Sequence, residues 1–274
     1  MKLPEQVYQF GFGARKVAIV GGVHGDEKVG VLVVEKLRTY LEGKTLTGTA
    51  FLIIGNPRAV ELNKRFVDED LNRLFHFEFD TKNPQTLEQK RALELAPVLE
   101  QCHFGVDLHS TIKPSVPFVY TKAGGERMKL ARCFDVECIV TTGTPTLNCL
   151  DGFIDRNPVD GQAFTVETGW HKDLEKVDGI FASVVEILNT LEVLESGVPP
   201  GKRKKPQELT TYLRVIVDHP SFRFTQELAN FQRLPAGTVI AKSDLKEFRL
   251  DRDSVVLFPK SLLEVGKPAV TLAE

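Results

Sequence analysis

The stretch KVAIVGGVHGDEKVG, residues 16–30, decides the fold of this chain. Its apolar run at residues 17–20 is typical of a buried strand, and the glycine pair that follows ends the strand. From Lys28 to Leu41 apolar residues recur at helical spacing, which predicts a helix over this range. A buried strand followed closely by an amphipathic helix is the repeating unit of an α/β protein.

The same alternation continues through the first two thirds of the chain. The sequence predicts further strands at residues 49–54, 106–109, 118–120, 138–141 and 163–167, and further helices at residues 86–102 and 172–194. Pro97 should kink the first of these two helices. This alternation favours a mixed or mostly parallel sheet with helices on both faces, in which functional sites form at the carboxyl ends of the strands.

The composition changes at residues 196–206, SGVPPGKRKKP, where glycine, proline and basic residues cluster. Such a cluster can be a targeting or nucleic-acid-binding patch, but a solvated linker is the favoured interpretation. Beyond it, residues 209–217, 238–241 and 254–258 are typical of short strands. We therefore expect a large domain over residues 1–200 and a small C-terminal β domain over residues 207–274, which needs to pack on the first for stability.

The overall composition excludes several classes of protein. The 274 residues are 42% hydrophobic and 26% charged, as in ordinary globular proteins, and a net charge of −2 argues against a nucleic-acid partner. No segment is apolar enough to span a membrane, and the first residues lack the apolar core of a signal peptide. Four cysteines without a C-x-x-C pair are typical of reduced thiols. We expect a cytoplasmic protein, and a homo-oligomer stays open.

Two histidines and a glutamate carry the most informative chemistry. His24 and Glu27 lie three residues apart in the turn after the first predicted strand, and His109 ends the strand predicted at residues 106–109. Two imidazoles and one carboxylate, with a fourth position left for water, are a ligand set of catalytic zinc sites. A lone histidine is more often an ordinary polar residue, so the hypothesis of one zinc per chain requires that the two strand ends be neighbours.

Polar residues in two later motifs indicate an anionic substrate. Arg58 follows a strand-ending Asn-Pro in GNPRA, and Asn72 and Arg73 lie in DEDLNRLF. Each arginine has an alternative reading as a surface residue in a salt bridge. A guanidinium at the rim of the sheet, beside a metal, would instead bind a carboxylate bidentately. The amide of Asn72 can fix the orientation of one carboxylate oxygen.

Glu167 ends the apolar strand predicted at residues 163–167 and precedes Thr-Gly, an unusual place for a merely solvated charge. A zinc hydrolase needs a carboxylate that is not a ligand, to take a proton from water and pass it to the leaving amine. Glu167 is the candidate. Asp107 faces the same side of its strand as His109. It either orients that histidine or makes an ordinary buried hydrogen bond.

Together, GGVHGDE, GNPRA, DEDLNRLF, DLHST and VETG, in this order and spacing, resemble the aspartoacylase and succinylglutamate desuccinylase family of zinc hydrolases. The resemblance covers about residues 17–169 and is weak afterwards. It implies a zinc carboxypeptidase-like fold, with a mixed sheet flanked by helices. It also implies that His24, Glu27 and His109 hold the zinc and that Glu167 is the catalytic acid/base.

By the same resemblance, Arg58 would stabilise the oxyanion together with the metal, and Asn72 and Arg73 would hold a substrate carboxylate. Family members that act on acetylaspartate carry a tyrosine and an arginine shortly before the catalytic glutamate. The nearest residues here are Phe153 and Arg156, with the arginine about one position out of step. Arg156 is therefore the candidate for binding the side-chain carboxylate of the substrate.

Those relatives also lend a tyrosine from the C-terminal domain. Here the only tyrosine after Gly169 is Tyr212, and the comparable late segment is LFPK at residues 257–260, in which Lys260 would supply a point charge. The resemblance thus implies an intact zinc machinery with altered specificity residues. Acetylaspartate is accordingly expected to be a weaker substrate than some other acidic N-acyl amino acid.

The sequence favours a zinc-dependent amidohydrolase that removes a small acyl group, acetyl or succinyl, from an N-acylated acidic amino acid. The closest alternative is a zinc carboxypeptidase acting on short peptides, which shares the metal site and requires a cleft open to a chain. A third alternative is a binding protein that kept the fold and lost catalysis. The presence of every catalytic residue, Glu167 included, argues against it.

Overall fold

The computed structural model of the chain describes residues 2–143, 149–195 and 205–274. The helices are α1 (Lys28–Leu41), α2 (Pro57–Leu62), α3 (Leu87–Leu99), α4 (Gly125–Ala131), α5 (Leu150–Ile154) and α6 (Val177–Thr190), with 3-10 turns at Leu71–Arg73 and Leu174–Lys176. The first strands are β1 (Val7–Phe10), β2 (Lys16–Gly21), β3 (Thr49–Ile54), β4 (Phe104–Thr111), β5 (Phe118–Lys122), β6 (Cys138–Thr142) and β7 (Gln162–Trp170). The later strands are β8 (Gln207–Ile216), β9 (Arg223–Phe224), β10 (Arg233–Leu234), β11 (Val239–Lys242), β12 (Glu247–Arg249), β13 (Ser254–Leu257) and β14 (Pro268–Ala273).

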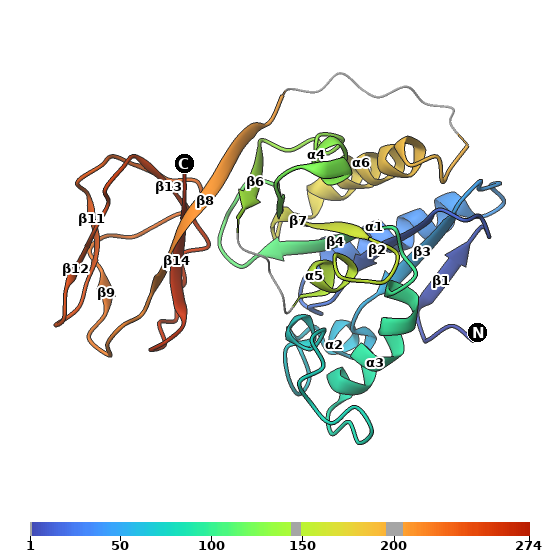
Figure 1. The fold of residues 1–274 in the computed structure, drawn as a ribbon, viewed down its shortest axis with the longest axis horizontal. Helices are drawn as coiled ribbons and strands as arrows, with labels where there is room; N and C mark the ends of the chain where they lie inside the picture. The colour runs from blue at the N-terminus through green and yellow to red at the C-terminus, as the bar shows by residue number, and fades with distance from the viewer. Residues whose placement is uncertain (1, 144–148, 196–204) are drawn as a thin grey trace.

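The strands form one large mixed sheet and one small sheet (Figure 1). Among the described residues, eleven strands join in the order β1-β3-β2-β4-β7-β5-β6-β8-β14-β13-β10, and three more form an antiparallel sheet in the order β12-β11-β9. The pairs β2–β3, β2–β4, β4–β7 and β5–β6 are parallel. The α/β class predicted from the alternation of strands and helices is therefore confirmed.

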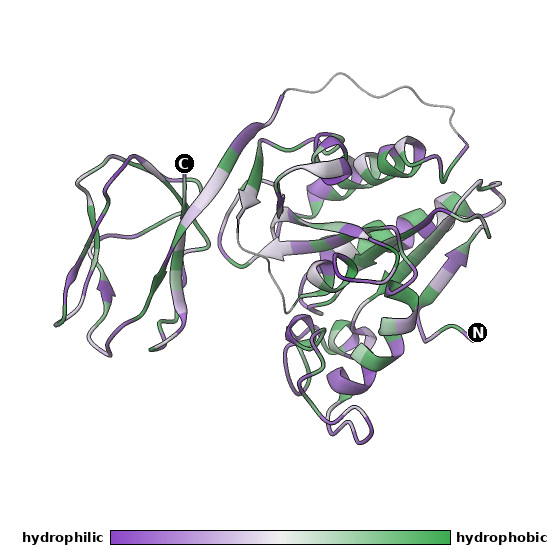
Figure 2. Cartoon of the chain, in the orientation of Figure 1, coloured by the Kyte–Doolittle hydropathy of each residue, from purple (hydrophilic) through white to green (hydrophobic). Residues whose placement is uncertain are grey.

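The centre of the large sheet is buried on both faces. Val17 and Ile19 of β2 pack in one hydrophobic cluster with α1, α4 and α6, and Ala18 and Val20 pack in another with α3 and α5. These two sets of helices lie on opposite sides of the sheet (Figure 1). Figure 2 shows hydrophobic residues gathered on the central strands between the two helical layers. A strand covered on both sides needs an unbroken apolar run, and residues 17–20 provide one.

Two helices are shorter than the sequence predicts. α3 ends at Leu99 rather than at residue 102, two residues after Pro97, which lies inside the helix. α6 begins at Val177 rather than at residue 172, because β7 extends to Trp170 and a 3-10 turn follows it. It ends at Thr190, and Glu192 then adopts a left-handed φ of 56°. Within the described ranges, no helix combines the length and apolar character needed to cross a bilayer.

The C-terminal strands continue the large sheet. β8 pairs in parallel with β6, and β14 pairs antiparallel with the other edge of β8. The hydrogen-bonded sheet therefore runs from the α/β part directly into the C-terminal β part (Figure 1). The division into residues 1–200 and 207–274 stays a prediction. Residues 196–204 of the predicted linker lie outside the described residues.

Candidate metal centre and active site

Parallel pairing of β2 and β4 brings the three candidate ligands together. The register places Gly21 of β2 opposite Leu108 of β4, so the turn that carries His24 and Glu27 lies beside His109. The expectation that the two strand ends are neighbours is confirmed. No local signal in the sequence could assemble these residues without this pairing, because β2 and β4 are separated by α1, β3, α2 and α3.

The turn after β2 is closed tightly around glycine. Gly22 has a φ of 66°, in the left-handed region that glycine adopts without strain. A Cβ atom at Gly25 would lie only 2.0 Å from the carbonyl carbon of Ala59 in α2. The Gly25 N–H also donates to the carbonyl oxygen of Arg65 at 3.2 Å. Glycine at position 25 therefore allows α2 and the chain that follows it to approach the metal-ligand turn.

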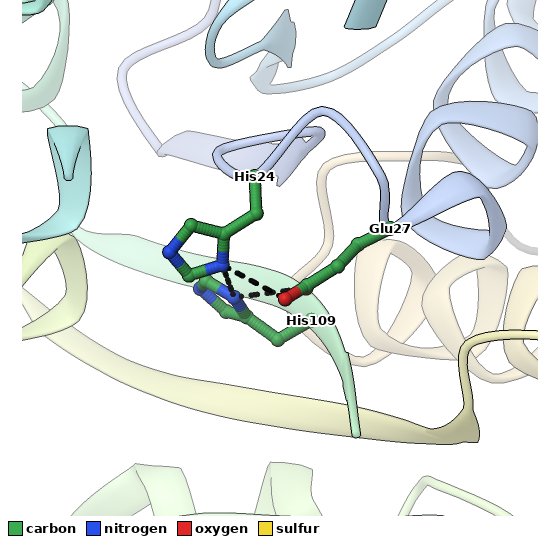
Figure 3. A group of neighbouring side chains, drawn as sticks. All are labelled: His24, Glu27 and His109. Atoms are coloured by element: carbon green, nitrogen blue, oxygen red, sulfur yellow. Dashed lines mark hydrogen bonds and ion pairs between the residues drawn. The ribbon is translucent and has the colours of Figure 1, made fainter. Parts of the chain in front are cut away.

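The side chains of His24, Glu27 and His109 converge on one point (Figure 3). Nδ1 of His24 lies 2.8 Å from Oε1 of Glu27, and Nδ1 of His109 lies 3.1 Å from Oε2 of the same carboxylate. The two Nδ1 atoms are 3.2 Å apart. All three residues are buried, and one ligand atom from each lies within 4.8 Å of the others. Two nitrogens and a carboxylate oxygen form a donor set that suits zinc.

The second nitrogen of each imidazole is bound by another carboxylate. Nε2 of His24 lies 3.0 Å from Oδ1 of Asp70, and Nε2 of His109 lies 2.9 Å from Oδ2 of Asp107. When each Nε2–H donates to its carboxylate, each Nδ1 keeps a lone pair that faces the common point. The contact at Asp107 supports the first of its two proposed roles, the orientation of His109.

The carboxylates also set the charge of the cluster. Burial by itself would lower the pKa of His109, but Asp107 and Glu27 raise it well above the ordinary value of 6.5. Burial would raise the pKa of Glu27, but His109 and His24 bring it far below the usual range for a glutamate. The cluster therefore stabilises positive charge, and a divalent cation can take the place of the protons on the imidazoles.

Glu167 lies next to this cluster on the same face of the sheet. It is the register partner of His109 on the adjacent parallel strand, although β7 continues beyond it to Trp170. Its side chain is partly exposed, but Oε2 is buried and has no hydrogen-bond partner among the described residues. Burial raises the pKa of Glu167 to about 7. Such a carboxyl group can take up and release a proton near neutral pH.

The raised pKa predicts that Glu167 destabilises the metal-free protein at high pH. Its carboxyl group has a pKa near 4.5 when unfolded and about 7 when folded, so ionisation opposes folding increasingly as the pH rises through this range. We compare the unfolding free energies of metal-free Glu167→Gln and of the metal-free unsubstituted protein. The advantage of the variant should be about 2 kcal/mol larger at pH 8 than at pH 5. Urea unfolding at both pH values measures this gain, and a difference independent of pH would contradict it.

The structure does not bring Arg58 to the cluster. Its side chain is 53% exposed and pairs with Glu61 one helical turn further along α2, because α2 buries the neighbouring residue and turns Arg58 to solvent. Arg65, which the sequence analysis missed, lies there instead. Its Nη1 is 3.4 Å from Oε1 of Glu27, and its Nη2 is 3.5 Å from Oδ2 of Asp70. The guanidinium group that contacts a candidate metal ligand, Glu27, is thus that of Arg65.

Asn72 and Arg73 lie beside the cluster in the 3-10 turn at Leu71–Arg73. Oδ1 of the buried Asn72 accepts a hydrogen bond from the N–H of Leu150 at 3.0 Å, and its Nδ2 lies 3.5 Å from Nε2 of His109. The amide oxygen is therefore used within the protein. Arg73 is exposed, and its Nη1 donates to the carbonyl oxygen of Asn72 at 3.3 Å. Within the described residues it has no carboxylate partner, so its guanidinium can bind an anion.

Arg156 does not reach the cluster. It follows α5 with an exposed side chain, and in the described part of the chain no hydrogen bond or ion pair joins it to the metal ligands. The next residue, Asn157, is buried against carbonyl oxygens at the end of α3, which turns Arg156 outward. Phe153 packs on Phe75 and Phe77, with ring centroids 5.8 and 5.5 Å away. The structure therefore places Arg156 at the surface, and its role in binding a substrate carboxylate stays a prediction.

One C-terminal residue lies close to the active site. Burial lowers the pKa of Lys260, the charges of Arg65 and Arg73 lower it further, and the charge of Glu167 raises it. Lys260 is therefore near enough to interact electrostatically with these groups. The hydroxyl group of Tyr212 instead lies 2.5 Å from that of Ser254 in β13, within the C-terminal part.

Comparison with known sequences identifies relatives along most of the chain. The succinylglutamate desuccinylase/aspartoacylase catalytic domain matches residues 13–152, just over half of the chain. A succinylglutamate desuccinylase of Pseudoalteromonas atlantica is 26% identical over 284 residues, which span 93% of this chain and 80% of that protein. A second, from Yersinia pseudotuberculosis, is 23% identical and spans 92% of this chain and 82% of its own length.

Solved structures share the fold, including its C-terminal strands. A succinylglutamate desuccinylase from Vibrio cholerae has a TM-score of 0.82 at 18% identity, covering 98% of this chain and 85% of that chain. An ectoine utilization protein from Ruegeria pomeroyi has a TM-score of 0.73 at 18% identity, covering 97% and 88%. At such identities the likeness shows the fold alone, and the family assignment rests on the catalytic-domain match. The chain belongs to the succinylglutamate desuccinylase/aspartoacylase family.

Proposed function

We propose that the protein is a zinc-dependent hydrolase that removes a small acyl group, acetyl or succinyl, from an N-acylated acidic amino acid. The observation that carries this proposal is the convergence of buried His24, Glu27 and His109, with Glu167 beside them on the same face of the sheet. Succinylglutamate desuccinylases among the relatives support a deacylation reaction. The proposal includes one zinc ion per chain.

Each residue of the cluster has a defined task in this reaction. His24, Glu27 and His109 would hold the zinc, which supplies Lewis-acid polarisation of water and of the amide carbonyl group. Glu167 takes a proton from the attacking water and later gives it to the departing amine nitrogen. In the metal-free protein its pKa is about 7, and a carboxyl group that titrates near neutral pH can act first as a base and then as an acid.

Arg65, rather than Arg58, is the residue that we assign to the oxyanion. Its guanidinium lies against Glu27 and Asp70, directly beside the candidate ligands. Negative charge develops on the carbonyl oxygen as water attacks, and a cation fixed at this position stabilises that charge. Arg58 pairs with Glu61 on the exposed side of α2, so it cannot perform this task without leaving that position.

The assignment predicts opposite results for the two arginines. Arg65→Met should lower kcat by roughly 10²–10³-fold, as expected for the loss of one group that stabilises the oxyanion. Arg58→Met, the matched control in the preceding helix, should leave kcat within about twofold of the original value, because its side chain faces solvent. Steady-state kinetics of both variants decide the matter. A large effect at Arg58 and a small one at Arg65 would restore the original assignment.

Positive charge around the site indicates where a substrate carboxylate would bind. Arg65, Arg73 and Lys260 lie close enough for the two guanidinium groups to lower the pKa of the lysine. An anion bound among them would relieve this repulsion. Because Lys260 lies in the loop between β13 and β14 of the C-terminal part, its presence here also favours a site that is confined to small substrates over one open to a peptide chain.

Arg73→Ala should raise KM for the acidic substrate by about 10–100-fold. The reason is that hydrogen bonds between a guanidinium group and a carboxylate contribute roughly 1.5–3 kcal/mol, which an anionic substrate gains from Arg73 and an amidated one does not. The same substitution should hardly change the already poor hydrolysis of the corresponding amide. Measuring KM for the acid and the amide with both proteins tests this, and an equal loss for the two substrates would remove Arg73 from carboxylate binding.

A small set of substrates tests the proposed function as a whole. N-acetylaspartate, N-acetylglutamate, N-succinylglutamate, their amides and short peptides should be compared by amine release, together with the zinc content of the purified protein. We expect the free acids to be preferred, with acetylaspartate not in first place because Phe153 lacks a hydroxyl group and Arg156 faces outward. Efficient cleavage of peptides alone would favour a carboxypeptidase instead.

A further inference from the structure

Glu88, in the first turn of α3, is a fully buried carboxylate outside the metal cluster. Within the described residues no lysine or arginine pairs with it. A buried carboxylate without compensating partners is strongly unfavourable. The hydrogen-bond donors around Glu88 must therefore compensate for its burial.

Four N–H groups surround this carboxylate in place of a cation. Oε1 of Glu88 accepts hydrogen bonds from Nδ2 of Asn56 at 2.9 Å and from the N–H of Val67 at 2.7 Å. Oε2 accepts from the N–H groups of Asp68 at 3.1 Å and Glu69 at 3.4 Å. Three of the four donors are consecutive backbone amides, and the N-terminus of α3 adds its partial positive charge. Glu88 thus fixes the backbone of residues 67–69.

Side chains of residues 68 and 69 bind α3 in return. Oδ2 of Asp68 accepts from the N–H of Leu87 at 2.9 Å. Oε1 of Glu69 accepts from Oγ1 of Thr86 at 2.7 Å and from Nε2 of Gln89 at 2.8 Å. Residues 67–69 are therefore attached to the start of α3 through both their backbone and their side chains, although the two segments are joined by a long connection.

Residues on either side of this attachment touch the metal cluster. Arg65 contacts Glu27, and Asp70 binds Nε2 of His24. We propose that Glu88 is a positioning residue that holds residues 67–69 so that Arg65 and Asp70 reach the metal ligands. The kinetic consequence rests on the proposed function, whereas the ordering of the segment applies equally to the metal-free protein.

Glu88→Gln tests this proposal at nearly constant size and shape. The new NH₂ group would face backbone N–H groups that now meet a carboxylate oxygen. In the metal-free protein, hydrogen exchange of the amides of residues 67–69 should become at least roughly 10-fold faster. Zinc affinity should fall by about 10–100-fold, because Asp70 no longer orients His24. kcat should fall as well, because Arg65 is displaced, while far-ultraviolet circular dichroism stays unchanged.

Arg91→Lys is the matched control, since Arg91 is also buried and lies one turn further along α3. Its guanidinium donates to the carbonyl oxygens of Glu5, Ile54 and Gly55, away from residues 67–69. The single ammonium group of a lysine cannot reproduce the arrangement of these guanidinium hydrogen bonds, so the melting temperature should fall. Exchange at residues 67–69 and zinc affinity should stay as in the unsubstituted protein. The same changes in both variants would show a general loss of stability and overturn the proposal.

Glu69→Ala keeps the proposal testable if Glu88→Gln does not fold. It removes only the contacts to Thr86 and Gln89, and should accelerate exchange at residues 67–69 to a smaller extent. Unchanged exchange and zinc affinity in both Glu88→Gln and Glu69→Ala would refute the positioning role. If the unsubstituted protein instead hydrolyses no N-acyl amino acid while exchange responds as expected, the proposed function is wrong and the role of Glu88 stands.

Discussion

Replacing His109 with alanine should abolish both metal binding and hydrolysis. The substitution removes one of the three donors and leaves His24 and Glu27, and two protein ligands hold zinc poorly. It also removes the imidazole whose Nδ1 lies 3.1 Å from the Glu27 carboxylate. Elemental analysis of the purified protein should show about one zinc per chain before the substitution and almost none after it.

Stability gives a second measurement that does not depend on finding the substrate. A metal that binds only the folded chain raises the melting temperature, so a chelator should lower it in the unsubstituted protein but not in His109→Ala. His219→Ala is the control, because His219 lies in the C-terminal part and contacts Ser221 rather than the cluster. It should keep both zinc and the chelator effect. Full zinc occupancy in His109→Ala would exclude this residue as a ligand.

The three candidate ligands could be predicted because each has a fixed place in a strand-and-turn unit. The run at residues 17–20 had to be a strand, and the turn after it had to present His24 and Glu27. His109 could be added on one condition, that β4 lie next to β2 in parallel, and the register meets this condition. The residue types predicted this proximity, because two histidines and one glutamate can bind one zinc ion only when their side chains lie close together.

The arginine that lies beside the candidate metal ligands could not be predicted in the same way. Arg58 follows a strand end directly, but it lies in a short helix, α2, in which Ala59 is the one buried residue and Arg58 is exposed. Asn63 then ends α2 in a left-handed conformation with φ 50°, and the chain returns so that Arg65 faces the cluster. The available signal was that Arg65 lies just before DEDLNRLF, the motif that supplies Asp70 and Asn72. Reading that motif as one unit with its preceding residues would have found it.

The continuity of the large sheet also could not be predicted from the sequence. The strand pattern at residues 209–217 predicts β8 but not its neighbours. Its parallel partner, β6, ends before α5, β7 and α6, and a pairing across so long a connection leaves no local pattern. The loop between two of these C-terminal strands, β13 and β14, holds Lys260, whose pKa the charges of Arg65, Arg73 and Glu167 shift.

Replacing Glu167 with glutamine should leave the metal site intact and lower kcat by roughly 10²–10⁴-fold, the usual contribution of a positioned general base. Glutamine has the same shape but cannot take a proton from water. Glu167 is not among the three ligands, and its Oε2 has no partner in the described residues whose loss would disturb the fold. Zinc content, kcat and KM of the purified variant provide the test.

Asp107→Asn offers a matched contrast, because Asp107 is a second carboxylate beside His109 with a different expected task. Its Oδ2 lies 2.9 Å from Nε2 of His109, so its loss should weaken zinc binding by about 10–100-fold. At saturating zinc its kcat should exceed that of Glu167→Gln, since the proton acceptor is still present. If Glu167→Gln loses zinc, or keeps near-normal turnover at full occupancy, then the catalytic base is another carboxylate. The two variants together therefore distinguish the residue that supports zinc binding from the residue that transfers the proton.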